Sequence, residues 1–305
     1  MKNGNFHPYA CVAVIGWSMA YVYTRIALQH FSAYSLGFLR YLISSGGLAL
    51  AVALLKTETP KKKDLGLFAA SGAVGFSLYV IVFNIGSATV TGATGSVIVS
   101  TAPVVTALLA RVIYDERLRA LQWIAIVIEF VGVLILTLGN GTFTVNMGVL
   151  WLSLAALLLG SYNLLQRRLT RSYTAFQASA FSIFAGTLML AVFIPSSIRE
   201  MPGVTLSQFG ALVMLGVFPG AVAYVAWSKA LERADNTSSV SNYMFLTPFL
   251  AALLGFLLAK EVPDSSTLLG GTVVLTGVLL FNLGKSGLGS GIIRQDRRAQ
   301  APAER

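Results

Sequence analysis

Long apolar runs follow one another along most of the chain, and short polar segments separate them. Each run is about as long as the roughly 20 residues that an α-helix needs to cross a bilayer. The pattern predicts an all-α integral membrane protein with ten spanning helices, at residues 8–29, 32–55, 65–87, 91–113, 119–139, 147–168, 173–195, 206–231, 237–259 and 265–285.

Composition supports a membrane protein and gives little sign of other chemistry. Hydrophobic residues make up 55% of the chain and charged residues only 11%, whereas soluble domains carry about 25% charged residues. Cys11 is the single cysteine, so it has no internal disulfide partner, and His7 and His30 lie apart from each other. We therefore expect neither a metal site nor a cofactor.

The basic residues predict the orientation of the spans. If the N-terminus is cytoplasmic, the inner segments hold 18 of the 22 Lys and Arg, whereas the outer loops hold only Arg199 and Lys260. Basic residues concentrate on the cytoplasmic side of membrane proteins. We therefore expect both termini to be cytoplasmic and the protein to lie in the inner (plasma) membrane. This asymmetry accounts for the net charge of +10 without nucleic acid as a partner.

The chain contains a repeat at an offset of 145 residues. Pro103 corresponds to Pro248, Glu116 to Glu261, and Gly132 to Gly277. We predict two related halves, residues 1–140 and 141–287, followed by a disordered basic tail at 288–305. Because each half has five spans, the second half enters the membrane in the opposite sense. Inverted halves of this kind can exchange between outward-open and inward-open states.

Several short motifs resemble a known family. They are Gly16-Trp17-Ser18, Phe38-Leu39-Arg40-Tyr41, Tyr114-Asp115-Glu116-Arg117-Leu118 and Lys260-Glu261. Together with the doubled spacing, they resemble the EamA-type, ten-span members of the drug/metabolite transporter superfamily over residues 8–285. The resemblance implies ten helices around a central cavity and the carriage of a small organic metabolite, most often outward. It also places the fifth and tenth spans away from the cavity, and it leaves the substrate open.

Two arginines fall within predicted spans. A charge at that depth is costly and needs a partner or a wet cavity. Arg40 is either an anion-binding or gating charge, or a structural residue that caps a helix end or snorkels outwards. Trp17, Tyr21 and Arg25 share one helix face and could receive an amphipathic carboxylate. For Arg25, snorkelling to the outer interface is the preferred interpretation.

Polar and aromatic side chains within the spans are candidates for lining the cavity. Two of them, Tyr79 and Tyr224, are related by the repeat and could meet across its axis. The alternative for each is interhelical packing or hydrogen bonding. The full set of cavity candidates is Trp17, Tyr21, Arg40, Tyr79, Asn84, Asn163, Tyr224, Trp227, Asn242 and Tyr243.

Glu129 and two prolines have further candidate roles. Glu129 lies near the middle of a span and could couple transport to protons, but its repeat equivalent Val274 cannot titrate. A neutral carboxylic acid, hydrogen-bonded between helices, is the preferred interpretation. Pro103 and Pro248 should kink the fourth and ninth spans and are hinge candidates.

These patterns favour a secondary transporter over an enzyme. We expect an exporter of small metabolites that works by alternating access, with amino acids as the best substrate class. Other substrates remain open, namely drugs or cations, sugar phosphates and nucleotide sugars. A channel or an intramembrane lipid-modifying enzyme is a remote alternative. The expected partners are a small-molecule substrate and the lipid bilayer, and the coupling ion and the oligomeric state stay open.

Overall fold

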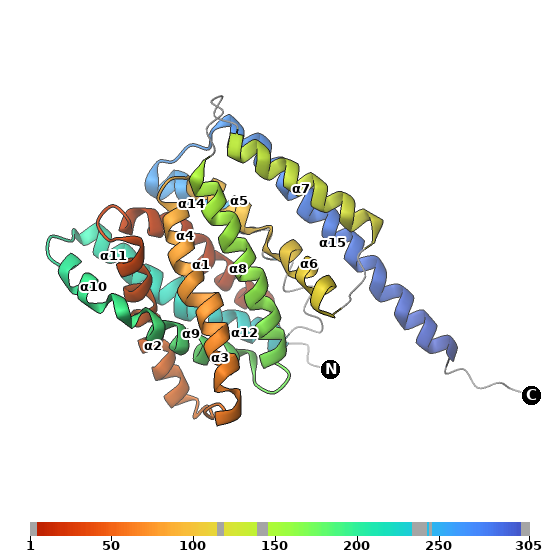
Figure 1. The fold of residues 1–305 in the computed structure, drawn as a ribbon, viewed down its shortest axis with the longest axis horizontal. Coiled ribbons are helices and arrows are strands. Elements are labelled where there is room, and N and C mark those ends of the chain that lie inside the picture. Colours follow the sequence, from red (N-terminus) through yellow and green to blue (C-terminus); the bar gives the residue numbers. More distant parts are fainter. Residues whose placement is uncertain (1–4, 115–118, 139–145, 234–242, 244–245, 300–305) are drawn as a thin grey trace, which may run out of the picture.

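A computed structural model describes residues 5–114, 119–138, 146–233, 243 and 246–299, and within these residues the chain forms helices and turns without strands (Figure 1). In chain order the elements are α1 (His7–Ala27), α2 (Ala33–Leu54), η1 (Lys62–Asp64), α3 (Leu65–Gly72), η2 (Ala73–Leu78), α4 (Tyr79–Ser87), α5 (Gly92–Val99), α6 (Ala102–Tyr114), α7 (Ala120–Leu138), α8 (Met147–Leu169), α9 (Ala175–Leu190), η3 (Ala191–Phe193), α10 (Ile194–Glu200), α11 (Leu206–Leu215), η4 (Gly216–Val222), α12 (Ala223–Arg233), α14 (Thr247–Ala259) and α15 (Ser265–Ala299).

Hydroxyl side chains mark the starts of several helices. Ser32 caps α2 and Thr91 caps α5, each accepting a hydrogen bond from a backbone N–H three residues on. Thr174 and Thr205 begin α9 and α11 with capping boxes, in which a glutamine returns a bond to the backbone of the cap. Such caps satisfy backbone donors that a helix leaves free at its start.

Among the described residues, seven helical segments are long and apolar enough to cross a membrane, and three shorter apolar helices accompany them. The shorter ones are Ala120–Leu136, Thr247–Ala259 and Ser265–Phe281. Large apolar side chains such as Leu54, Leu188 and Phe130 are exposed, as expected for a surface that contacts lipid. The all-α membrane class fits these findings, whereas the count of ten spans stays a prediction.

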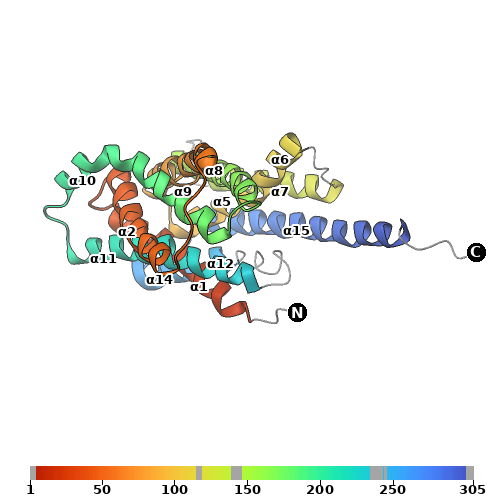
Figure 2. The ribbon, with the colours of Figure 1, turned by 90° about the horizontal axis from the view of Figure 1, so that it is seen from below.

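Contacts between helices occur in pairs that match the repeat. Two pairs of repeat mates pack against each other, α2 with α9 and α7 with α15. Contacts between helices that are not repeat mates also occur twice. The offset relates α1 to α8 and α4 to α12, and both α1–α12 and α4–α8 are in contact; in the same way α2–η4 corresponds to α9–η2. Figure 1 and Figure 2 show α7 and α15 side by side, apart from the main group of helices. The packing therefore follows the 145-residue offset.

The α7–α15 pair encloses Glu129. A Cβ added at Gly132 would lie 2.6 Å from the Val274 side chain, and a Cβ added at the repeat-related Gly277 would lie 2.5 Å from the Glu129 Cγ. Glu129 is buried, but neither of its carboxyl oxygens has a hydrogen-bond partner among the described residues. The predicted hydrogen bond between helices is therefore wrong for Glu129, because the positions that face it on α15 are glycine and aliphatic residues, which have no polar side-chain group.

Two π-helical segments lie at equivalent places in the two halves. These are η2 and η4, and an offset of 145 residues brings most of one onto the other. Pro219 lies inside η4, where it has no N–H to donate. The segment η2 directly precedes Tyr79, and η4 ends two residues before the repeat-related Tyr224. π-Helical turns often occur at functional sites, and the sequence pattern did not reveal them.

Both hinge candidates lie at helix starts rather than within helices. The fourth predicted span is interrupted at residues 100–101, and Pro103 is the second residue of α6. Pro248 is in the first turn of α14, where a missing N–H costs no helical hydrogen bond. The prediction of mid-helix proline kinks was therefore wrong. Their role as hinges stays a prediction.

The last helix is longer than the sequence suggested. α15 continues to Ala299, so residues 288–299, which we expected to be disordered, are helical. Figure 1 shows this part of α15 extending away from the other helices.

Candidate functional site

Arg40 lies on α2 in the interior of the helix group. It is only 6% exposed, and its Nε and Nη1 have no hydrogen-bond partner among the described residues. Its guanidinium carbon lies 5.4 Å from the centroid of the Tyr41 ring. Neither capping of a helix end nor snorkelling describes this placement. A buried cation with unused N–H groups is a costly arrangement, and an anionic ligand would complete it.

Aromatic rings from both predicted halves come together beside α2. Trp17 on α1 contacts Tyr224 and Trp227 on α12, with centroids 5.7 and 5.1 Å apart. Tyr224 contacts Phe76 of η2 at 5.8 Å, and Phe76 contacts Tyr41 at 5.4 Å. The rings thus form a continuous group from α1 across α12 and η2 to α2.

A second aromatic group lies beside the first. Tyr21 on α1 and Tyr79 on α4 both contact Phe83, at centroid distances of 5.4 and 5.7 Å. The Arg40 charge lies within electrostatic range of the Tyr21, Tyr79 and Tyr224 hydroxyls, and Tyr79 is also within range of Tyr224. The arginine and five of the other candidates, Trp17, Tyr21, Tyr79, Tyr224 and Trp227, therefore belong to one neighbourhood.

Of the three asparagines among the cavity candidates, Asn84 and Asn163 are described, and both make hydrogen bonds between helices. The Asn84 side chain donates to the Ala33 carbonyl at 2.9 Å and so holds the start of α2, while its own Oδ1 has no partner among the described residues. Asn163 on α8 donates to the Thr106 hydroxyl on α6 at 3.1 Å. These contacts match the packing alternative, although the free Asn84 oxygen leaves an acceptor in the interior.

The remaining two candidates are Tyr243 and Asn242. Tyr243 hydrogen-bonds His7 at the start of α1, has a ring contact with Phe6, and packs in the same cluster as Trp227. Its role in lining the cavity stays a prediction. Asn242 lies outside the described residues.

Arg25 forms an ion pair with Glu261, in the connection between α14 and α15. The other carboxyl oxygen of Glu261 accepts the Gly92 N–H at 2.9 Å, at the first residue of α5. A carboxylate at a helix start is favoured by the helix dipole. Glu261 therefore joins three segments, α1, α5 and the α14–α15 connection. Snorkelling was the wrong interpretation of Arg25, because its guanidinium pairs with Glu261 rather than with the membrane interface.

Some residues at the site were missed by the sequence analysis. Phe76 lies at the centre of the first aromatic group and is fully buried. Tyr162 on α8 contacts Phe76 at 5.1 Å, and it was not among the cavity candidates. Gly75 permits this contact, since a Cβ there would lie 2.1 Å from the Tyr162 ring. The repeat-related pair Gly75 and Gly220 was the available signal for close packing here.

The arrangement suits a small ligand that carries both an apolar part and an anionic group. The rings offer apolar surface and ring faces, and Arg40 offers charge-assisted hydrogen bonds. Arg40, Tyr21 and Tyr41 are all buried, so the helices must separate to admit a ligand. Among the described residues, no group of three or more His, Cys, Asp or Glu is placed to hold a metal ion.

Comparisons with known proteins agree with this fold. The EamA-like transporter family matches residues 7–138 and 146–283. The "Uncharacterized transporter YdfC" of Bacillus subtilis is 32% identical over 86% of this chain and 86% of its own length. The "Probable terminal-alkyne amino-acid exporter" of Streptantibioticus cattleyicolor is 29% identical over 89% of this chain and 91% of its own. One solved crystal structure, 18% identical, superposes with a TM-score of 0.62 over 92% of this chain and 98% of that one.

Proposed function

Because the chain belongs to the EamA-like transporter family, we propose that it is a secondary transporter that exports small organic metabolites, with amino acids as the substrate class. The observation that carries the substrate proposal is Arg40, buried with two unpartnered nitrogens beside aromatic rings from both halves. A substrate carboxylate would accept the hydrogen bonds that Arg40 leaves unmade. The relative named "Probable terminal-alkyne amino-acid exporter" supports the same class.

Alternating access is the proposed mechanism. The repeat-matched contacts between helices support two halves of similar structure, and inverted halves can exchange conformations around a fixed central site. In the proposed topology ten spans form halves at residues 1–140 and 141–287, and both termini face the cytoplasm. Exchange would separate α1 from α5 and α14 at one end, where Glu261 now joins them.

Counterflow in proteoliposomes tests the transport proposal. Vesicles are preloaded with a mixed amino-acid pool, and uptake of labelled amino acids is measured for wild type, Arg40→Gln and Arg199→Gln. Arg199 is an exposed arginine on α10, so its variant controls for the loss of one charge. Saturable exchange that survives in the Arg199 variant and is lost in the Arg40 variant is the expected result.

Other outcomes separate the alternatives. A channel would show no counterflow, and an enzyme would alter the labelled compound chemically. Exchange of sugar phosphates but not amino acids would keep Arg40 as the anion site and change the substrate class. Exchange of organic cations alone would contradict the role assigned to Arg40, because a buried arginine repels a cation.

The proposed orientation has its own test. In a Cys11→Ser background, a cysteine placed at Ser286 just beyond the last predicted span should react with a membrane-impermeant thiol reagent only in inside-out vesicles. Reaction in right-side-out vesicles would place the C-terminus outside.

A further inference from the structure

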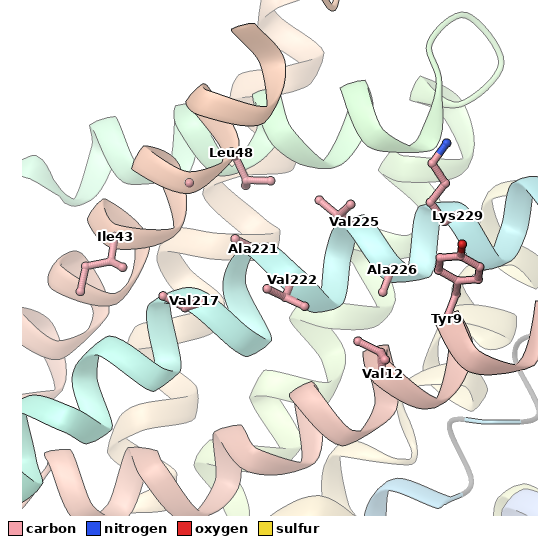
Figure 3. A pocket seen from close by; sticks show the side chains of 11 residues that line it. Tyr9, Val12, Ile43, Leu48, Val217, Ala221, Val222, Val225, Ala226 and Lys229 are labelled. Atoms are coloured by element: carbon pink, nitrogen blue, oxygen red, sulfur yellow. The ribbon is translucent and has the colours of Figure 1, made fainter. Parts of the chain in front are cut away.

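A groove between α1 and α2 runs along the face of α12 that points away from the interior of the helix group. Its volume is about 520 Å³, and Figure 3 shows its walls. Val217, Ala221, Val225 and Lys229 line it at intervals of four residues along η4 and α12, and Gly47 lies on the α2 wall. Val217 is exposed, as is Val12 on the α1 wall, so the groove opens away from the interior. Tyr224 and Trp227 contact Trp17 from the other side of α12, and the groove is separate from the candidate site.

The groove is apolar along its length and basic at one end. Lys229 and Tyr9 lie together at that end, beyond the row of valines and alanines (Figure 3). Arg233, one turn further on α12, places its guanidinium carbon 4.6 Å from the centroid of the Tyr9 ring. This end coincides with the start of α1 and the end of α12, the side where basic residues concentrate along the whole sequence. Its charge is therefore complementary to an anionic headgroup at the inner membrane surface.

The length of the groove also fits a lipid. From Val217 to Lys229 the helix advances twelve residues, which is about 18 Å at about 1.5 Å per residue. One leaflet of the hydrocarbon core is about 15 Å thick. An acyl chain that enters from the inner leaflet would therefore lie along the valines and alanines while its headgroup reached the basic end.

We propose that this groove binds an anionic phospholipid of the inner leaflet, with one acyl chain along α12 and the phosphate near Lys229 and Arg233. The acyl chain would then contact α1, α2 and α12 together, and it would cover the face of α12 that α1 and α2 leave exposed. Occupancy would stabilise the contact of α12 with both helices and leave the interior around Arg40 unchanged.

Two neighbouring glycines provide a matched test. A Cβ at Gly47 would lie 3.5 Å from the Ala221 Cβ, whereas a Cβ at Gly46 would meet nothing within 4 Å. Gly47→Leu therefore places a side chain in the groove, and Gly46→Leu places the same side chain on open surface of the same helix. Both gain similar helix propensity. Should the Gly47 variant fail to fold, Ala221→Leu fills the groove from the α12 wall.

The experiment measures the thermal stability of purified, delipidated protein in detergent, with added phosphatidylglycerol, phosphatidylcholine or inorganic phosphate. For wild type and Gly46→Leu we expect phosphatidylglycerol at about 100 times its Kd to raise Tm by roughly 5–10 °C. Phosphatidylcholine should give a much smaller rise, and phosphate alone almost none. Gly47→Leu should lose the rise, and the double variant Lys229→Ala, Arg233→Ala should lose the preference for phosphatidylglycerol.

A second double variant controls for general surface charge. Lys62→Ala, Lys63→Ala removes two exposed cations in η1, on the same predicted side of the membrane, and should keep the lipid preference. Equal rises with both lipids in the wild type, or a full rise in Gly47→Leu, would overturn the proposal. An equal rise with inorganic phosphate would also overturn it, because the groove would then not be needed.

Discussion

Removing the charge of Glu261 should loosen the end of the molecule where α1, α5 and the α14–α15 connection meet. Glu261→Gln keeps an acceptor for the Gly92 N–H, at 2.9 Å in the wild type, but it loses the ion pair with Arg25. A hydrogen bond to a charged group contributes about 1.5–3 kcal/mol and a neutral one about 0.5–1.5 kcal/mol. Replacing the charged acceptor by a neutral one in both contacts, with Gly92 and with Arg25, therefore costs about 2 kcal/mol. The Arg25 side chain is 31% exposed, and solvent screening lowers the total to about 1–2 kcal/mol.

A free-energy change of that size shifts the population of the open conformation by about 5–30-fold. The readout is the labelling rate of a cysteine at position 21 in a Cys11→Ser background, measured in detergent. Tyr21 is 7% exposed, and its Cβ lies 3.4 Å from the Cβ position of Gly92, so opening between α1 and α5 exposes it. We expect Glu261→Gln to raise the labelling rate by about 5–30-fold.

Glu200 provides the control for this prediction. Its carboxylate accepts the Ser32 N–H at 2.8 Å at the start of α2, so Glu200→Gln removes a similar charge at a different helix start. The labelling rate in that variant should change by less than about twofold, because the α1–α5 contact is untouched. An unchanged rate in Glu261→Gln, or an equal rise in both variants, would refute the reasoning.

Three further predictions concern packing and the site. A Cβ at Gly72 would lie 2.7 Å from the backbone of Gly186, so Gly72→Ala should lower the free energy of unfolding by about 1–3 kcal/mol. Gly66 has open space around it, so Gly66→Ala should raise the free energy of unfolding by about 0.5–1 kcal/mol. Equal denaturation midpoints for the two variants would contradict the close contact at Gly72. Glu129→Val copies the repeat-related residue, removes an unpartnered buried carboxyl group and should raise thermal stability while exchange persists; loss of exchange in a stable variant would instead support proton coupling. Tyr224→Ala should raise the KM for exchange by about tenfold through lost ring contacts, whereas Tyr243→Ala should leave it nearly unchanged, and the reverse order would move the site.

Features that depend on repetition were predictable from the sequence. The 145-residue offset relates α2 to α9 and α7 to α15, and in the structure each of these pairs packs together. It also identified Gly132 and Gly277 as a matched pair. Hydropathy alone gave most helix positions, since spans must satisfy their backbone hydrogen bonds internally.

Features that depend on distant partners were not predictable. The Arg25–Glu261 pair joins residues 236 positions apart, and nothing in either local pattern points to the other. The π-helical segments contain the repeat-related Gly75 and Gly220, and η4 also contains Pro219, but the hydropathy pattern does not distinguish a π-helix from an α-helix. Arg40 was identified as a candidate from its cost within a span, but only the structure shows that its nitrogens lack partners.

The most direct test of the account measures whether Arg40 recognises a carboxylate. Counterflow of the transported amino acid and of its methyl ester is compared in wild type and Arg40→Gln. In the wild type the ester should compete about 10–150-fold more weakly, which corresponds to the loss of about 1.5–3 kcal/mol of charge-assisted hydrogen bonding. In Arg40→Gln the acid and the ester should compete almost equally. If the variant discriminates between them as strongly as the wild type does, Arg40 is not the anion site and the account is contradicted.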